Sequence, residues 1–192
     1  MRRGRGVGAT EPTPVLVTVD VQTGMDSPYW GRRNNAQAEA NMARLHAAFR
    51  REGQPLVHVR HSSRNPSSPL APGSPGVAFK REVMPAAGEV VLTKNVNSAF
   101  IGTDLERILR DLGAAPVVVI GLTTCHCVSS TIRMAANLGF DVVAVEDAMA
   151  EFDLPGRDGA VVRAEVAHEA ELAALRGEFA RIVTTSELLA EL

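Results

Sequence analysis

The stretch that decides the fold runs Pro116-Val-Val-Val-Ile-Gly-Leu-Thr-Thr-Cys-His-Cys127, followed by Val-Ser-Ser-Thr-Ile-Arg-Met-Ala-Ala-Asn-Leu138. Its opening is a short β-branched run that is apolar on both faces, which is typical of a buried strand in a parallel sheet. A tight Gly/Thr turn joins this run to a helical pattern from Cys127 to Leu138. The stretch therefore predicts a strand that passes directly into a helix.

The same alternation of strand and helix patterns continues on both sides of this stretch. Strands are predicted at 15–20, 55–60, 89–93, 116–120, 141–146 and 180–184, and helices at 35–52, 103–112, 127–138 and 163–176. Strands that alternate with helices form a sheet covered on both faces, with right-handed crossovers. We expect a three-layer α/β/α sandwich with a six-stranded, mostly parallel sheet, similar to a Rossmann fold.

The composition of the chain argues against two classes of binding partner, nucleic acids and membranes. The chain has 192 residues, 45% of them hydrophobic and 22% charged, and its net charge is −2. This predicts one globular domain at 13–192 after a flexible tail at 1–12. Without a basic field and with only 4% aromatic residues, no nucleic-acid partner is expected. No apolar run approaches the roughly 20 residues of a membrane span, so no membrane partner is expected either.

The two cysteines, Cys125 and Cys127, stand two residues apart, too close for an unstrained disulfide. The chain thus has the cysteine usage of a reducing compartment, and a cytoplasmic location is expected. Substrate specificity is expected to lie in the loops 22–35 and 62–85, the second of which is rich in Pro, Ser and Gly.

Three reactive residues follow predicted strands, where open parallel sheets bind their ligands. Asp20 ends the first strand, Lys94 follows the third, and Cys127 follows the fourth. Taken singly, Asp20 is compatible with a loop cap, Lys94 with a solvated side chain, and Cys127 with a small buried apolar residue. Because they converge on one edge, the three together suggest an activated nucleophile.

The place of Cys127 at a helix start gives it a chemical role. Free N–H groups and the helix dipole there favour a thiolate, which predicts a lowered pKa for Cys127. The same N–H groups can hold an oxyanion. Asp20 is the expected acceptor of the thiol proton, and Lys94 the expected stabiliser of the charged pair.

Three motifs in order carry a family resemblance. They are Val17-Thr-Val-Asp-Val-Gln22, Lys94-Asn-Val-Asn-Ser-Ala-Phe-Ile-Gly-Thr-Asp-Leu105, and Gly121-Leu-Thr-Thr-Cys-His-Cys-Val128, the last followed by Ala135-Ala-Asn-Leu-Gly139 and Glu146-Asp-Ala148. The chain resembles the isochorismatase-like cysteine hydrolases, which include nicotinamidases and N-carbamoylsarcosine amidohydrolases, over residues 14–190.

This resemblance implies a catalytic triad of Asp20, Lys94 and Cys127. It also implies a cis peptide bond between Leu122 and Thr123, with the backbone N–H groups of Thr123 and Cys127 as the oxyanion hole. The implied strand order is 3-2-1-4-5-6, and a homodimer or homotetramer is expected. One departure is Cys125, since the family commonly has Asp or Asn two residues before the nucleophile. We favour a plain substitution there over a redox role or a Cys-x-Cys metal site.

No metal or other cofactor is expected. Some relatives hold a metal with an Asp and several His, but the corresponding segment, Val57–Ser63, contains no carboxylate. His58 and His61 stand three residues apart, so a regular strand points them to opposite faces. For His58 we expect a core position with a hydrogen bond to the backbone.

Four residues are expected to line the substrate pocket: Gln22, Trp30, Arg60 and Phe100. Arg60 is either a contact to a substrate carboxylate or a member of an ion pair. Trp30, with its neighbour Tyr29, forms either a pocket wall, a packing lid or a subunit contact. Phe100 has the same alternatives.

The expected function is hydrolysis of a C–N bond in a small amide or ureide, through a thioester on Cys127. Vinyl ether hydrolysis of the isochorismatase type is an alternative, but it proceeds without a cysteine nucleophile. A haloacid-dehalogenase-like phosphatase would need a second carboxylate where Gln22 stands. A non-catalytic binding protein remains the third alternative, because a fold does not fix a function.

Overall fold

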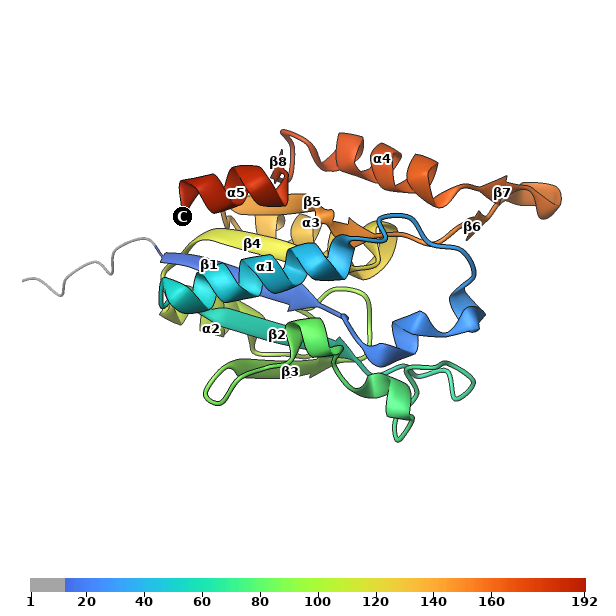
Figure 1. Ribbon diagram of the computed structural model, residues 1–192, viewed down its shortest axis with the longest axis horizontal. Helices are drawn as coiled ribbons and strands as arrows, with labels where there is room; N and C mark the ends of the chain where they lie inside the picture. Colours follow the sequence, from blue (N-terminus) through green and yellow to red (C-terminus); the bar gives the residue numbers. More distant parts are fainter. Residues whose placement is uncertain (1–12) are drawn as a thin grey trace, which may run out of the picture.

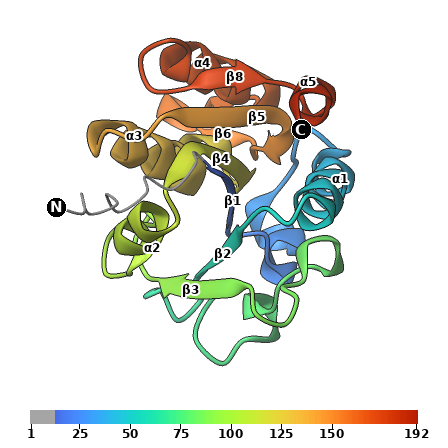
Figure 2. The same ribbon diagram turned by 90° about the vertical axis from the view of Figure 1, so that its left-hand side faces the viewer.

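A six-stranded parallel sheet forms the centre of the molecule. The computed structural model describes residues 13–192; the expected tail at 1–12 lies outside the described residues. The sheet order is β3-β2-β1-β4-β5-β8 (Figures 1 and 2). The strands are β1 Thr13–Val19, β2 Leu56–His61, β3 Val90–Lys94, β4 Ala114–Leu122, β5 Val142–Ala150 and β8 Arg181–Val183. Since β8 is the predicted sixth strand, this arrangement confirms the expected order.

Helices cover both faces of the sheet, as predicted (Figure 2). The helices α1 (Ala38–Arg51) and α5 (Thr185–Glu191) lie on one face. The helices α2 (Leu105–Asp111), α3 (Ser129–Asn137) and α4 (Ala164–Leu175) lie on the other. Each face has its own apolar core, because apolar side chains alternate between the two faces along each strand: Leu16 packs towards α1, and Val15 and Val17 towards α2 and α3.

Two strands are longer than the sequence predicts. β4 continues to Leu122 and β5 continues to Ala150, because their carboxyl halves pair again, Gly121 with Met149, after an irregularity in the register. Asp147 consequently lies inside β5, where its Oδ1 accepts the backbone N–H and hydroxyl of Thr185 at the start of α5. The longer β5 carries its last residue to the same sheet edge as Asp20.

Gly121 allows β1 and β4 to meet closely at that edge. Its φ is +136°, and a Cβ atom there would lie 2.1 Å from the backbone oxygen of Val19. Only glycine therefore fits beside the end of β1. Asp20, the residue that follows β1, has a φ of +56°, a sparsely populated conformation for a non-glycine residue.

The two long loops pack against each other beside this edge. The loop after β1 contains the 3₁₀ turns Thr23–Asp26 and Pro28–Trp30, and the loop after β2 contains those at Pro75–Val77 and Arg81–Val83. Gln22 joins them: its Nε2 donates to the backbone oxygens of His61 and Val77, and its Oε1 accepts the N–H of His61. The loops are thus anchored to β2 by a buried amide.

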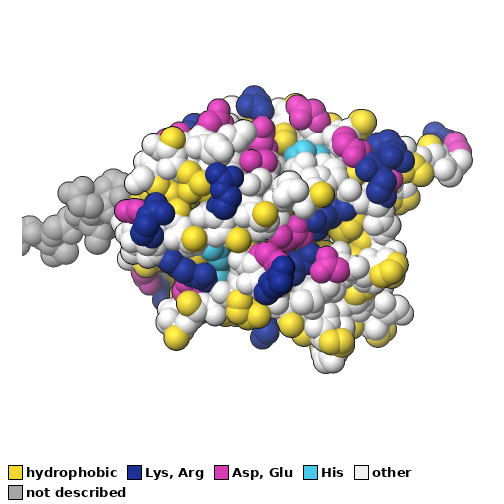
Figure 3. Space-filling model, in the orientation of Figure 1, with side chains coloured by type: hydrophobic (Ala, Val, Ile, Leu, Met, Phe, Trp, Pro, Cys, Tyr) yellow, Lys and Arg dark blue, Asp and Glu magenta, His cyan; other side chains and the backbone are white. Residues whose placement is uncertain are grey.

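A short antiparallel hairpin extends from the same end of the molecule (Figure 1). It consists of β6 (Leu154–Pro155) and β7 (Val161–Val162), which pair only with each other. On the face drawn in Figure 3, cationic and anionic side chains are intermixed with apolar ones and form no basic patch. Among the described residues, no helix is long and apolar enough to span a membrane.

Candidate active site

Asp20, Lys94 and Cys127 meet at the carboxyl edge of the sheet. Nζ of Lys94 donates to Oδ2 of Asp20 at 2.6 Å, and both side chains are fully buried. A carboxylate oxygen of Asp20, a ring nitrogen of His61 and Sγ of Cys127 all lie within 4.8 Å of one another. The three residues that the sequence singled out are therefore neighbours in space, and His61 joins them.

The register of the sheet explains how distant residues reach one place. Asp20 follows the central strand β1, and Cys127 follows β4, which is the neighbour of β1. Lys94 ends β3, which is separated from β1 by β2, and it pairs in register with His61. The long Lys94 side chain crosses the end of β2, where its Nζ also lies 3.2 Å from Nδ1 of His61 and donates to the backbone oxygen of Val96.

Burial controls the protonation of this group. It raises the pKa of the Asp20 carboxyl, and the Lys94 ammonium opposes that effect. The pKa of the Cys127 thiol is raised to about 12, by burial first and by the charge of Asp20 second. The pKa of His61 is lowered to about 4, by burial and by the charge of Lys94. At neutral pH Cys127 is therefore a thiol and His61 a neutral imidazole, beside an Asp20 carboxyl of raised basicity.

The expected low pKa of Cys127 is therefore wrong for the free enzyme. Cys127 lies in a π-helical turn, Thr124–Val128, and α3 begins only at Ser129. Burial of the Cys127 thiol and the nearby Asp20 raise its pKa by more than Lys94 lowers it. Cys127 needs a proton acceptor to become nucleophilic, and Asp20 is placed to be one.

The turn before Cys127 has the backbone conformation that the family resemblance implies. The Leu122–Thr123 peptide bond is cis, as expected. The backbone oxygen of Thr123 accepts the N–H groups of His126 and Val128, both at 3.2 Å. The π-helical turn replaces the first part of the predicted helix, and such turns occur frequently at functional sites.

A cavity of about 360 Å³ opens above the three residues. Its lining includes Asp20, Cys127, His61, Asn97, Thr123, His126, Glu151 and Asp153, together with the apolar Met25, Tyr29, Trp30, Leu70, Phe152, Leu154 and Pro155. Trp30 is held rigidly, because its Nε1 donates to the backbone oxygen of Gly24 and its ring stacks on Phe152 at 5.9 Å. Trp30 thus lies where the sequence placed it, while Tyr29 beside it is 57% exposed.

Three other expected pocket residues lie outside this cavity. Gln22 is fully buried in the loop contacts described above. Arg60 donates from Nε to the hydroxyl of Thr93, because side chains alternate along β2 and the next residue, His61, takes the pocket side. Phe100 packs into the core and stacks on Phe140, and from its segment it is Asn97 that lines the cavity.

Glu151 is a pocket residue that the sequence analysis missed. Its side chain is 1% exposed, and its Oε2 and Oε1 accept the backbone N–H groups of Cys125 at 2.6 Å and of Phe152 at 2.9 Å. It thereby holds the turn that carries Cys127. The sequence does contain a signal for Glu151, a carboxylate directly after the apolar run Ala148-Met-Ala150. Because the predicted strand ends at Glu146, this signal was not recognised.

Cys125 is a free thiol that lies outside the lining of this cavity. Its Sγ donates to the backbone oxygen of Ala167, on α4. Burial and the adjacent Glu151 raise its pKa well above the usual range. These surroundings make it a poorly reactive thiol.

The histidines His58 and His61 lie in different surroundings. His58 lies in the core, as expected, on the other side of β2, with its Nε2 2.8 Å from Glu89 and its ring against His46 of α1. His61, Asp20 and Cys127 are the one group of potential metal ligands that residues 13–192 bring together. This group does not suit a resident cation, since the Lys94 ammonium already lies against both Asp20 and His61.

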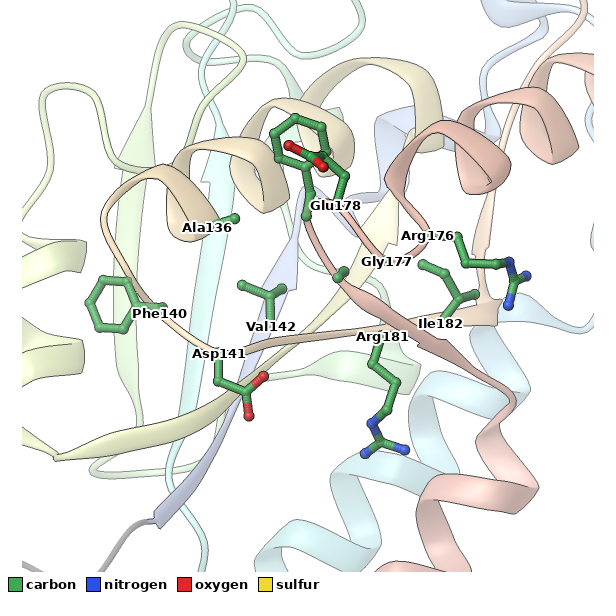
Figure 4. Close-up of a pocket in the computed structure, with 11 residues that line it drawn as sticks. Ala136, Phe140, Asp141, Val142, Arg176, Gly177, Glu178, Arg181 and Ile182 are labelled. Carbon is green, nitrogen blue, oxygen red and sulfur yellow. The ribbon is translucent and has the colours of Figure 1, made fainter.

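A larger cavity, of about 550 Å³, lies at the other end of the sheet (Figure 4). It is lined by the connections that lead into β5 and β8, among them Phe140, Asp141, Arg176 and Arg181. No cysteine or histidine belongs to its lining. It also lies at the amino ends of these strands, away from the edge where parallel sheets bind ligands.

Comparison with known proteins identifies the family. The family model described as Isochorismatase domain matches residues 14–187. The chain belongs to the isochorismatase family. It is 42% identical to the uncharacterized isochorismatase family protein YrdC of Bacillus subtilis, over 93% of this chain and 96% of that protein.

Isochorismatase-family structures and enzymes extend this match. A crystal structure of a putative hydrolase of the isochorismatase family from Chromobacterium violaceum is 43% identical, with a TM-score of 0.89 and coverage of 98% of this chain and 97% of that one. Maleamate amidohydrolase of Pseudomonas putida is 30% identical over 64% of this chain and 53% of its own length. These similarities support a hydrolase, as expected from the sequence.

Proposed function

We propose that the chain hydrolyses a C–N bond of a small amide or ureide through a thioester on Cys127. The observation that carries this proposal is the contact group at the sheet edge: a buried thiol, a buried carboxylate with a raised pKa and an ammonium that neutralises it. The name of the relative maleamate amidohydrolase supports amide chemistry in the same family.

In the first half-reaction, the Cys127 thiol gives its proton to Asp20 and its sulfur attacks the substrate carbonyl. The carbonyl oxygen becomes an oxyanion, for which the backbone N–H groups of Thr123 and Cys127 are the proposed donors. When the oxyanion collapses, the C–N bond breaks, and the nitrogen takes the proton from Asp20 and leaves as ammonia or an amine. The acyl group stays on the sulfur as a thioester.

In the second half-reaction, water gives a proton to Asp20 and its oxygen attacks the thioester carbonyl. The C–S bond breaks, the acid product leaves, and the sulfur recovers its proton. Lys94 compensates the charge of Asp20 whenever that carboxyl is ionised. The neutral His61, which lies beside both Asp20 and Cys127, is placed to hold the attacking water.

Vinyl ether hydrolysis is the second candidate within the family, but it gives the thiol at the centre of the site no task. A phosphatase of the Asp-x-Asp type is disfavoured because Gln22 is used to anchor the loops. The test of the proposal is ammonia release from a panel of primary amides and ureides, with Cys127→Ala as the control. Ammonia release by the chain and none by the variant is the expected result. Equal turnover by Cys127→Ala would refute the proposal.

A further inference from the structure

The charges around the candidate active site are unequal. Among the residues that line the cavity, three are acids, Asp20, Glu151 and Asp153, and within residues 13–192 no lysine or arginine belongs to the lining. Lys94 lies just beneath, but its ammonium is occupied by Asp20, His61 and the backbone of Val96. A substrate that enters this cavity therefore meets no free cationic side chain in the described chain.

The guanidinium groups that contact the lining residue Asp153 are also occupied. Arg32 pairs with Asp153 at 3.0 Å and with Glu165, and Arg163 lies 3.5 Å from Asp153. Both arginines therefore neutralise the Asp153 carboxylate at the cavity rim. They are held outside the lining itself.

Glu151, by contrast, has no lysine or arginine partner among the ion pairs of the described residues. Its two oxygens are held by backbone N–H groups, and its one ion-pair partner among the described residues is His126, whose Nδ1 lies 3.9 Å away. Any positive charge on the half-exposed His126 is thus met by Glu151. His61, the other basic group, is neutral at pH 7 because its pKa is lowered to about 4.

Apart from Asn97, Thr123 and His126, the remainder of the lining is apolar. Trp30 and Phe152 stack to form one side, and Met25 and Leu70 belong to the same lining. Such a surface favours an apolar substrate body, whereas a substrate carboxylate would lose its hydration without gaining a free cationic partner.

We infer that the site selects amides without a carboxylate, whose non-reacting part is apolar and either neutral or positively charged. This inference rests on the proposed amide hydrolysis and adds the charge class of the substrate to it. Glu151 is the specificity-determining group, because it is the buried carboxylate in the wall that no lysine or arginine neutralises.

The first experiment compares three amides of one chain length: pentanamide, 5-aminopentanamide and glutaramate. Ammonia release at neutral pH should give a kcat/KM for glutaramate at least about tenfold below that for pentanamide, and a value for 5-aminopentanamide equal to or above it. Maleamate, an amide with a carboxylate, should resemble glutaramate. Hydrolysis of either anionic amide as fast as pentanamide would overturn the inference and leave the proposed function standing.

The second experiment needs no turnover. Two methanethiosulfonates, one carrying a trimethylammonium and one a sulfonate, react with a thiolate to form a mixed disulfide and release methanesulfinate. Labelling of Cys127, measured by mass spectrometry in a Cys125→Ala background, is normalised to 2-mercaptoethanol. The ratio of cationic to anionic rates should exceed that of the free thiol by at least about tenfold. A ratio equal to or below that of the free thiol contradicts the inference.

Glu151→Gln tests the assigned group, with Glu106→Gln on the far helix α2 as a matched loss of one negative charge. The labelling ratio should fall towards that of the free thiol in Glu151→Gln and stay unchanged in Glu106→Gln. Equal ratios in the two variants would remove Glu151 from its assigned role. If no amide is hydrolysed, the proposed function fails, and the labelling ratio still decides the charge selectivity.

Discussion

Nζ of Lys94 lies 2.6 Å from Oδ2 of Asp20, and neither side chain is exposed to solvent. Each charge of such a pair is tolerated in the interior only because the other is present. Oδ1 of Asp20 accepts no hydrogen bond from the described residues. That oxygen is the one left to receive a proton.

Removing one charge of this pair should lower the free energy of unfolding more than removing both charges. Lys94→Met leaves a buried carboxyl without its counter-charge, and should lower the free energy of unfolding by about 3–5 kcal/mol. Asp20→Asn combined with Lys94→Met leaves no charge behind, so the double variant should be more stable than Lys94→Met alone. Urea unfolding near neutral pH measures both. Simply additive losses would mean that the two charges are not coupled.

Cys127, not Cys125, should be the nucleophile. Cys127→Ala should abolish hydrolysis, whereas Cys125→Ala should keep most of it, because the Cys125 sulfur points to Ala167 on α4 and away from the cavity. The measurement is kcat/KM for any amide that the chain hydrolyses, with thermal unfolding to show that both variants are folded. Retained activity in Cys127→Ala together with its loss in Cys125→Ala would exchange the two roles.

The raised pKa of Cys127 predicts an unusual alkylation profile. Iodoacetamide reacts with the thiolate, so labelling of the free enzyme should be slow at neutral pH and should rise about tenfold per pH unit towards pH 9. Asp20→Asn removes the charge that raises this pKa and leaves Lys94 to stabilise the thiolate. It should therefore label faster at neutral pH although it cannot hydrolyse amides.

The measurement for this prediction is peptide mass spectrometry after brief, limiting alkylation, in which Cys127 and Cys125 are distinguished by fragment ions. The control is Asp26→Asn, which removes a carboxylate at the surface. Slower labelling of Asp20→Asn than of the parent chain would show that Asp20 does not oppose thiolate formation.

Activity should be independent of added metal. The one group of potential ligands, Asp20, His61 and Cys127, includes the proposed base and nucleophile and lies against the Lys94 ammonium. Hydrolysis should continue at an unchanged rate after treatment with a chelator and gel filtration. Loss of turnover that Zn²⁺ or Fe²⁺ restores would instead make His61 a metal ligand.

Acid should destabilise the protein through a pair of buried histidines. His46 and His58 lie with ring centroids 5.2 Å apart beneath α1, and burial lowers the pKa of both, that of His46 to about 3. Below about pH 6.5 the unfolded chain binds protons that the folded rings do not, so stability falls as pH falls, by up to about 1.4 kcal/mol per pH unit for each group.

His46→Gln keeps a side chain that can bond to Thr18 but cannot take up a proton. The variant should lose less stability than the parent chain when urea unfolding is compared at about pH 7 and about pH 5. The half-exposed His126 supplies the control variant, His126→Gln. An unchanged pH dependence in His46→Gln would show that His46 binds its proton in the folded state as readily as in the unfolded one.

Much of the fold was predictable because β-branched runs and helical spacing are local signals. The strand order and the meeting of Asp20, Lys94 and Cys127 followed from the family motifs. The end of β5 did not, since Asp147 and the alanines beyond it carry little strand propensity and pair only through the tertiary register. Because the predicted strand ended too early, Glu151 was not recognised as a residue at the sheet edge.

Side-chain direction at the pocket was also hard to predict. Arg60 and His61 are adjacent polar residues at a strand end, and only the last residue of β2 faces the cavity. Gln22 stands two residues after Asp20, yet its side-chain hydrogen bonds go to the backbone of His61 at the end of β2 and of Val77 in the long loop. The thiol pKa was misjudged because sequence shows a helix start but not the depth at which it is buried.

Trp30 is the single tryptophan of the chain, and it forms the wall of the cavity. Intrinsic fluorescence excited at the indole band therefore reports from one known position, a ring held between Gly24 and Phe152. Occupancy of the cavity can be followed as a change in emission or in acrylamide quenching, on the unlabelled chain and in real time. Ligands that are never turned over thus become as measurable as substrates, and an inactive Cys127→Ala chain becomes a sensor for them.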